Sequence, residues 1–269
     1  MVRHLSMTPC QFSPSAEFQR YPVNESPGKS MLESNSNVSS DKAFYDQEPV
    51  GSAKEHENWM REIEFYFLSY ADKLNNKLWE TKGVVAELGA GSCGLSVCCS
   101  RLSNVKQIYA VDISMLRMQK MIGLSGVILG GDATKIEPLE ADFNLLLPFP
   151  DASLDAVLFD ASLHHSRSMW HLLAECRRVL KENGIIVAQR ESYLSAFRAK
   201  KQLAKLLSTP EVSANVSENM YLLAQYDYYL RVNGFDVSFM PRSPSQLKRV
   251  LSVFNGSVFC DGVLWCEKQ

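Results

Sequence analysis

No stretch constrains the fold of this chain more than residues 83–94, which read GVVAELGAGSCG. A short apolar run leads into Glu87, and three glycines follow at Gly89, Gly91 and Gly94. Because glycine lacks a Cβ, the backbone can turn tightly here and come close to a ligand. The pattern is typical of the first βα turn of a nucleotide-binding, doubly wound sheet, whose ligands lie at the carboxyl ends of the strands.

The glycines alone leave the nucleotide open. They also match the dinucleotide pattern G-x-G-x-x-G, and Asp112 follows about 20 residues later, as that pattern requires. Glu87 favours a cationic sulfonium cofactor instead, because a pyrophosphate gains nothing from a nearby carboxylate. Asp112 ends a second apolar run, where an acid can accept hydrogen bonds from ribose hydroxyls. Asp132 follows a third apolar run at 127–129, where an acid can accept from an adenine amino group.

The order and spacing of these motifs resemble those of the class I S-adenosylmethionine-dependent methyltransferases, in particular the branch that acts on small molecules. The resemblance covers residues 55–240 approximately. Its pieces are ELGAGSCG (87–94), VDIS (111–114), GDA (131–133), LPFPDASLDAV (147–157), SLHH (162–165) and RRVLKENG (177–184).

The resemblance implies S-adenosylmethionine as the cofactor, with Glu87, Asp112 and Asp132 around one cavity. A helix cap at Glu87 and plain turns at Asp112 and Asp132 are the alternatives. The residues assigned to the cofactor are Glu87, Gly89, Ala90, Gly91 and Gly94 at its methionine part, Asp112 and Ile113 at the ribose, Asp132 and Ala133 near the adenine, and Asp160 at the amino group or in its own loop.

The catalytic candidates follow the fourth expected strand, where His164 and His165 are adjacent. Methyl transfer to a hydroxyl needs alignment and removal of a proton, and a histidine titrates in the right range to accept it. We expect His165 to be the base, with His164 as the second candidate. Ordering of the loop by the two histidines is an equal alternative. Arg190 and Glu191 end the fifth strand and are expected either to bind the substrate or to pair with each other.

We expect an α/β fold with a doubly wound, mostly parallel seven-stranded sheet and an antiparallel edge strand. The expected parallel strands are 83–88, 107–111, 126–130, 154–160 and 184–190. Two further strands, 235–240 and 257–266, would form the antiparallel edge, with a helix at 243–254 between them.

Composition divides the chain into a tail and one domain. Residues 1–40 are rich in Ser, Pro and Asn, so we expect a disordered tail, followed by a single methyltransferase domain at 41–269. Residues 55–82 carry a one-sided apolar stripe and predict a cap helix, broken in the middle. Residues 192–215 read as an inserted lid with four basic residues, either a solvated face or a contact for an anionic substrate. These are Arg198, Lys200, Lys201 and Lys205.

Charge and cysteine content limit the partners. With 28 basic and 30 acidic residues, the chain gives no electrostatic case for nucleic acid. It has no apolar run of the length that spans a bilayer and no apolar core of a signal peptide, so we expect a cytoplasmic protein without membrane insertion. The seven cysteines lack metal-ligand spacing, and no metal is expected. Protein partners remain open.

The predicted activity is transfer of a methyl group to a small molecule. Oxygen is the favoured acceptor atom, and sugars, lipids and natural products are all compatible with the motifs. A non-catalytic, cofactor-binding scaffold is the main alternative, and an NAD-type oxidoreductase is a more distant one.

Overall fold

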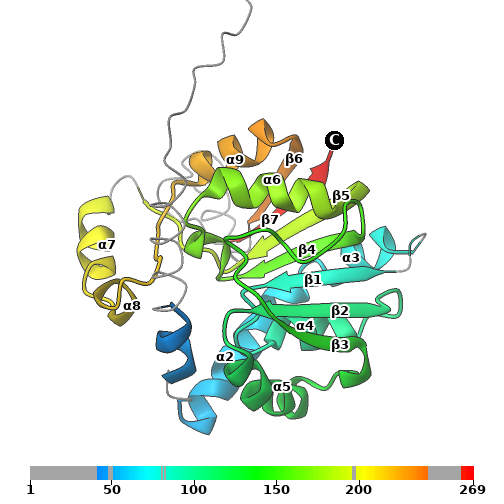
Figure 1. Cartoon of the computed structure of the whole chain (residues 1–269), viewed down its shortest axis with the longest axis horizontal. Coiled ribbons are helices and arrows are strands. Elements are labelled where there is room, and N and C mark those ends of the chain that lie inside the picture. The colour runs from blue at the N-terminus through cyan, green and yellow to red at the C-terminus, as the bar shows by residue number, and fades with distance from the viewer. Residues whose placement is uncertain (1–40, 48–50, 80, 82, 196–197, 242–261) are drawn as a thin grey trace, which may run out of the picture.

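The computed structural model describes residues 41–47, 51–79, 81, 83–195, 198–241 and 262–269. A seven-stranded sheet with the order β3-β2-β1-β4-β5-β7-β6 lies between two layers of helices (Figure 1). The strands are β1 (Val84–Leu88), β2 (Gln107–Asp112), β3 (Ile136–Glu140), β4 (Leu154–Asp160), β5 (Leu180–Gln189), β6 (Phe235–Pro241) and β7 (Gly262–Lys268).

Strands β1 to β5 pair in parallel, and β7 runs antiparallel between β5 and β6. The fold class predicted from the sequence is therefore confirmed, including the antiparallel edge formed by β6 and β7. The expected tail 1–40 and the expected helix 243–254 lie outside the described residues.

The helices cover both faces of the sheet. On one face lie α2 (Ala53–Phe67), α3 (Ala71–Lys77), α4 (Gly94–Ser100) and α5 (Met115–Leu129), and on the other lie α6 (Met169–Val179) and α9 (Leu223–Val232) (Figure 1). The short helices α7 (Ala199–Leu206) and α8 (Pro210–Ser213) stand to one side of the sheet, and helix 41–47 lies near its carboxyl edge. Two turns of 3-10 helix complete the set: η1 (Ala133–Lys135) and η2 (Leu163–His165).

The predicted strand at 126–130 is wrong. α5 continues to Leu129, and β3 begins only at Ile136. Val127 is 85% exposed, so the apolar run is the end of a helix and not a buried strand. A short apolar run cannot distinguish the two by periodicity alone. Residues 131–135 therefore lie at the amino end of β3, away from the edge where ligands bind in such sheets.

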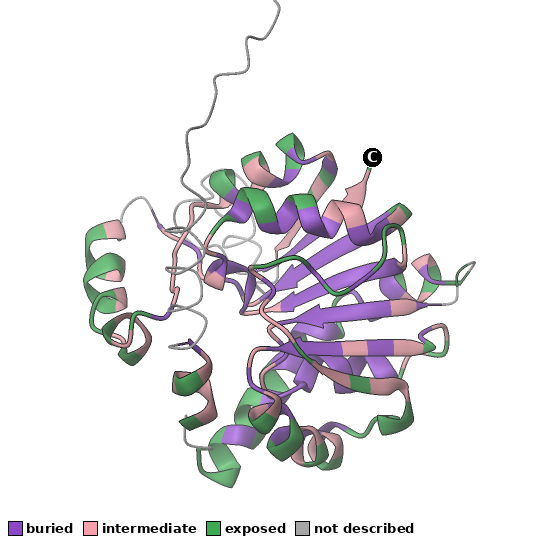
Figure 2. Cartoon of the chain, in the orientation of Figure 1, coloured by how far each residue is buried: buried purple, intermediate pink, exposed green. Residues whose placement is uncertain are grey.

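The central strands that end at the carboxyl edge of the sheet are largely apolar and buried. β4 is buried along six of its seven residues, and both faces of the sheet carry a hydrophobic cluster (Figure 2). Parallel strands covered on both faces require such continuous apolar runs. The predicted cap helix 55–82 is two helices, α2 and α3, and Met60 and Ile63 of α2 pack against Gly94 at the start of α4. None of the described helices is long and apolar enough to cross a membrane.

Gly83, just before β1, packs closely against the chain at Asn104, and substitution of this glycine tests that contact. Its φ is +60°, and a Cβ placed there would lie 1.8 Å from the carbonyl oxygen of Asn104. We expect Gly83→Ala to lower the free energy of unfolding by roughly 1–3 kcal/mol or more in urea denaturation. Gly123→Ala in α5, where a Cβ would meet nothing within 4 Å, is the matched control and should gain up to about 1 kcal/mol. Equal effects of the two changes would contradict this packing.

Candidate active site

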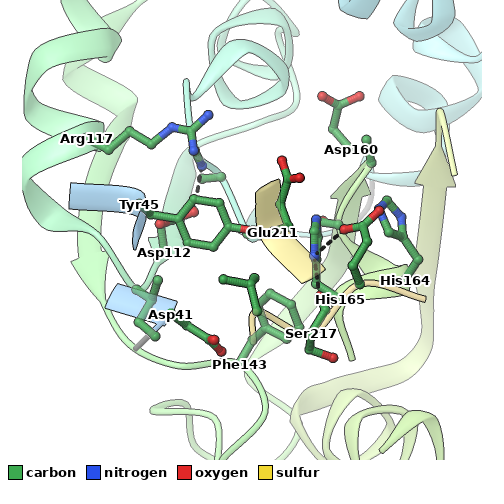
Figure 3. A pocket seen from close by; sticks show the side chains of 18 of the residues that line it. Asp41, Tyr45, Asp112, Arg117, Phe143, Asp160, His164, His165, Glu211 and Ser217 are labelled. Carbon is green, nitrogen blue, oxygen red and sulfur yellow. Dashed lines mark hydrogen bonds and ion pairs between the residues drawn. The ribbon is translucent and has the colours of Figure 1, made fainter. Parts of the chain in front are cut away.

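A cavity of about 300 Å³ lies at the carboxyl edge of the sheet, where the strand order reverses between β1 and β4. Ligands of doubly wound sheets bind at this switch point. Side chains from helix 41–47, α2, α5, α8 and several loops close around the space (Figure 3). The loop segments that border it are 89–92, 112–113, 141–144, 160–162, 164–165, 192 and 216–218.

The glycine loop is pressed against the loop that follows β4. Gly89 has a φ of +73°, and a Cβ on it would lie 2.6 Å from the Cβ of Ser162. The Ser162 hydroxyl donates to the carbonyl of Leu88 at 2.6 Å. Only a residue without a side chain fits here, so the loop presents backbone to the cavity along Gly89, Ala90 and Gly91.

Asp112 ends β2 and supports the glycine loop. Its Oδ2 accepts from the amide of Gly91 at 2.8 Å, and its Oδ1 accepts from the amide of Ser114 at 2.9 Å. Burial raises the pKa of Asp112, and these two hydrogen bonds work against that rise. The carboxylate and its neighbour Ile113 both border the cavity, where the remaining lone pairs can accept from a ligand hydroxyl.

Glu87 does not border the cavity. It is 1% exposed and accepts from the amide of Ser96 at 2.7 Å and from the Ser96 hydroxyl, so it caps the start of α4. These contacts agree with the alternative that Glu87 is a helix cap. Gly94 also lies behind the loop, where a Cβ would meet Ile63 and Met60 of α2. The expected arrangement of three acids around one cavity is wrong, because only Asp112 of the three borders it.

Asp132 and Ala133 also lie outside the cavity lining. Asp132 is exposed and accepts from the amide of Thr134 at 3.0 Å, as the cap of η1. Their assignment depended on the strand at 126–130, which the structure replaces with the end of α5. The residues that follow the true third strand, Asp142 and Phe143, border the cavity instead. The sequence contains little signal for them, because no element was predicted between residue 133 and the LPFP motif that begins at Leu147.

The two histidines stand on a loop that one buried carboxylate holds. The Oε1 of Glu191 accepts from the amides of Ser162 and Leu163, at 3.2 and 3.1 Å, and its Oε2 accepts from the amide of His164 at 3.1 Å. The same Oε2 lies 2.7 Å from Nδ1 of His164. Glu191 is therefore fully engaged inside the protein and does not border the cavity, contrary to the expected substrate contact.

His164 carries a positive charge. Burial alone would lower its pKa, but Glu191 on one side and Glu218 on the other raise it to about 10. Its Nε2 lies 3.5 Å from Oε1 of Glu218. An imidazolium between two carboxylates satisfies both charges in a buried place.

His165 is neutral. Burial lowers its pKa, and the charge of His164 lowers it further. Its Nδ1 lies 2.7 Å from the carbonyl oxygen of Ser217, which can only accept, so this nitrogen carries the proton. Nε2 then keeps its lone pair. Because the side chain of His165 borders the cavity, it offers a neutral base there (Figure 3).

His164, His165 and Glu218 also offer donor atoms that all lie within 4.8 Å of one another. Two imidazoles and a carboxylate form a common ligand set for divalent transition metals. Here the Nδ1 proton of His165 is used by the carbonyl of Ser217, and His164 is charged between two carboxylates. A metal ion at this cluster would compete with the contacts that Nδ1 of each histidine makes to Glu191 and Ser217.

Asp160 and Arg190 form a second ion pair near the cavity. Nε of Arg190 lies 3.0 Å from Oδ1 of Asp160, and Nε2 of Gln189 donates to the same oxygen at 2.9 Å. Burial raises the pKa of Asp160, while Arg190 opposes the rise. Asp160 borders the cavity, but Arg190 does not, so Arg190 pairs with Asp160 and not with Glu191.

One segment at the cavity went unrecognised in the sequence: helix 41–47, which contributes Asp41 and Tyr45 (Figure 3). The segment expected as a lid, 192–215, borders the cavity through Ser192 and through Glu211 of α8. The four basic residues of this segment, at 198, 200, 201 and 205, are exposed and do not border the cavity. This agrees with the alternative that they form a solvated face. Helix 41–47 follows the polar tail and is too short to show a periodic pattern.

Comparison with known proteins agrees with this geometry. Residues 86–188 match the family model of a methyltransferase domain, which spans the glycine loop, β4 and the histidines. Residues 86–188 are therefore a methyltransferase domain. No curated protein matches it.

Solved structures share the fold of this methyltransferase at low sequence identity. A chain in the complex of the Haloferax volcanii Trm112 methyltransferase activator with a protein described as a methyltransferase is 16% identical, with a TM-score of 0.52, covering 82% of this chain and 99% of that one. A geranyl diphosphate methyltransferase solved with its substrate and sinefungin is 16% identical, with a TM-score of 0.52, covering 75% and 77%. A Methanococcus maripaludis protein described as an S-adenosylmethionine-dependent methyltransferase is 15% identical, with a TM-score of 0.50, covering 83% and 96%.

The cavity of the methyltransferase fits its cofactor, S-adenosylmethionine, in the chemistry of its donors. The glycine loop leaves backbone open along Gly89 to Gly91, Asp112 offers lone pairs to ribose hydroxyls, and Ile113 and Phe143 offer apolar surface. Of the residues assigned to the cofactor from sequence, those that border the cavity are Gly89, Ala90, Gly91, Asp112, Ile113 and Asp160.

The buried Glu87 generates a prediction about stability. Burial raises its pKa to about 8, against hydrogen bonds from Ser96 that lower it, while the ordinary value is 4.5. Between these values the folded protein holds a proton that the unfolded chain releases, so the free energy of unfolding falls as the pH rises through this window. The loss should be on the order of a few kcal/mol.

Glu87→Gln removes the titrating group and keeps an oxygen that can accept from Ser96. We expect its stability to change less with pH than that of the wild type between pH 4.5 and 8, measured by urea denaturation. Parallel profiles for the two proteins would show that Glu87 titrates normally.

Proposed function

We propose that the protein transfers a methyl group from S-adenosylmethionine to a hydroxyl of a small molecule, with His165 as the general base. The observation that carries this proposal is the 2.7 Å contact between Nδ1 of His165 and the carbonyl oxygen of Ser217, which assigns the tautomer. The Ser217 carbonyl holds the proton of Nδ1, and the neutral ring borders the same cavity as the glycine loop and Asp112. When bound, S-adenosylmethionine supplies an activated methyl group on a sulfonium.

His165 would accept the hydroxyl proton at Nε2 as the acceptor oxygen becomes nucleophilic. The low pKa of His165 keeps the ring unprotonated at neutral pH, and the charge of His164 is one cause of it. Glu191 acts indirectly, because it holds the loop that carries both rings. Helix 41–47 and α8 would exclude water from the reacting groups.

The cavity, about 300 Å³, is at the lower end of the range for small-molecule sites, and in this proposal it holds the cofactor beside the acceptor. One protein of similar fold acts on geranyl diphosphate. The acceptor classes compatible with the motifs are sugars, lipids and natural products. A cofactor-binding scaffold without turnover is the alternative, and the experiment below separates the two.

His165→Gln tests the proposal. With methyl-labelled S-adenosylmethionine and a metabolite extract as the source of acceptors, we expect the wild type to label a small molecule. The variant should lose roughly 10²–10⁴-fold in turnover because the base is absent, while its affinity for S-adenosylhomocysteine changes little.

His171→Gln is the matched control, since His171 is exposed on α6 and does not border the cavity. Wild-type turnover in His165→Gln would remove the histidine from the mechanism. Cofactor binding with no labelled product from the wild type would favour the scaffold.

A further inference from the structure

Asp41, on helix 41–47, has a buried carboxylate oxygen without a partner. The residue is 6% exposed, and its Oδ2 accepts from Nη2 of Arg167. Its Oδ1 is buried, and no residue in the described part of the chain donates a hydrogen bond to it. A buried acceptor left unsatisfied is costly, and such groups in native proteins call for an explanation such as an absent ligand.

Two contacts fix the place of Asp41 above the ends of β2 and β3. Nζ of Lys42 donates to the carbonyl of Ile113 at 3.2 Å and pairs with Glu140 at 3.0 Å. Arg167 bridges Asp41 and Asp142, with its Nη1 2.9 Å from Oδ2 of Asp142. The start of helix 41–47 is thereby tied to the two loops that follow these strands.

This end of the cavity has the surface that a flat aromatic base needs. Ile113 and Phe143 both border the cavity, on the loops to which Asp41 is tied. The ribose carboxylate Asp112 is the residue before Ile113. An adenine attached to that ribose would therefore lie between these loops, with its amino group in need of an acceptor.

Asp142 is the other carboxylate at this end, and each of its oxygens already accepts a hydrogen bond from the protein. Oδ1 accepts from the amide of Asn144 at 2.9 Å, and Oδ2 accepts from Arg167. Asp41 also borders the cavity, and its Oδ1 has no such donor. We propose that Asp41 is an adenine-binding residue, whose Oδ1 accepts a hydrogen bond from the 6-amino group of the cofactor.

The inference rests on the cofactor and not on the identity of the methyl acceptor. It gives helix 41–47, which lies before the segment matched by the family model, a role in selecting the base. Arg167 supports that role, because it binds the other oxygen of Asp41, Oδ2, and the ion pair does not use Oδ1.

The test compares the affinities of the full-length protein for S-adenosylhomocysteine and S-inosylhomocysteine by calorimetry. The inosine compound carries an oxygen in place of the 6-amino group, so it would present an acceptor to an acceptor. We expect the wild type to prefer the adenosine compound by about tenfold or more. Asp41→Asn can both donate and accept, so the preference should fall about tenfold in this variant.

Asp46→Asn is the matched control. It makes the same change on the same helix, where Asp46 accepts from the hydroxyl of Ser114 and does not border the cavity. This variant should keep the wild-type preference. Asp41→Ala, checked for an unchanged unfolding midpoint, should lose affinity for the adenosine compound and gain none for the inosine compound.

An unchanged preference in Asp41→Asn, or an equal loss of affinity for both ligands, would overturn the inference and leave the cofactor assignment intact. The same loss of preference in Asp46→Asn would also overturn it. Failure of the wild type to bind S-adenosylhomocysteine would contradict the cofactor assignment itself, and this inference with it.

Discussion

The contact between Gly89 and Ser162 is the constraint on which the site depends. It brings the loop after β1 and the loop after β4 within van der Waals distance, with the Ser162 hydroxyl bonded to the carbonyl of Leu88. The first loop borders the cavity proposed for the cofactor, and the second carries the histidines. Because no side chain separates them, both loops border one cavity, which would hold the methyl donor beside the proposed base.

Buried carboxylates around this contact are balanced by cations held inside the protein. Arg167 forms ion pairs with Asp41 and Asp142, and Arg190 forms one with Asp160. The charged ring of His164 pairs with Glu191 and Glu218. A buried charge without a partner is strongly unfavourable, so each pair restricts where its loop can lie. The loops at the carboxyl edge are thus positioned by electrostatics, whereas the strands below them are positioned by apolar packing.

The same division explains how much could be predicted from sequence. The glycine loop, β1, β2 and β4 combine apolar runs with turn residues, and such local patterns identify strands and their order. The strand predicted at 126–130 was wrong because four or five apolar residues fit the end of a helix as well as a strand. Asp132 was then assigned to the wrong edge of the sheet.

The sequence has no pattern that indicates which side chains form pairs across long sequence separations. Glu191 reaches back to His164, and Arg167 reaches back to Asp41, over 27 and 126 positions. Glu87 illustrates the converse, since its place in the motif suggested a ligand contact while its oxygen atoms cap α4. The position of a residue in a motif predicted which loop it belongs to, but not which atoms it contacts.

The most direct test of this account is a titration of the histidine rings by NMR, with His164→Gln and His165→Gln used to assign the signals. The account predicts that the two neighbours shift in opposite directions: His164 should stay protonated until the pH approaches about 10, and His165 should lose its proton below its ordinary 6.5. Two rings that both titrate near the ordinary value would contradict the charged and neutral pair, and with it the role of His165 as a base.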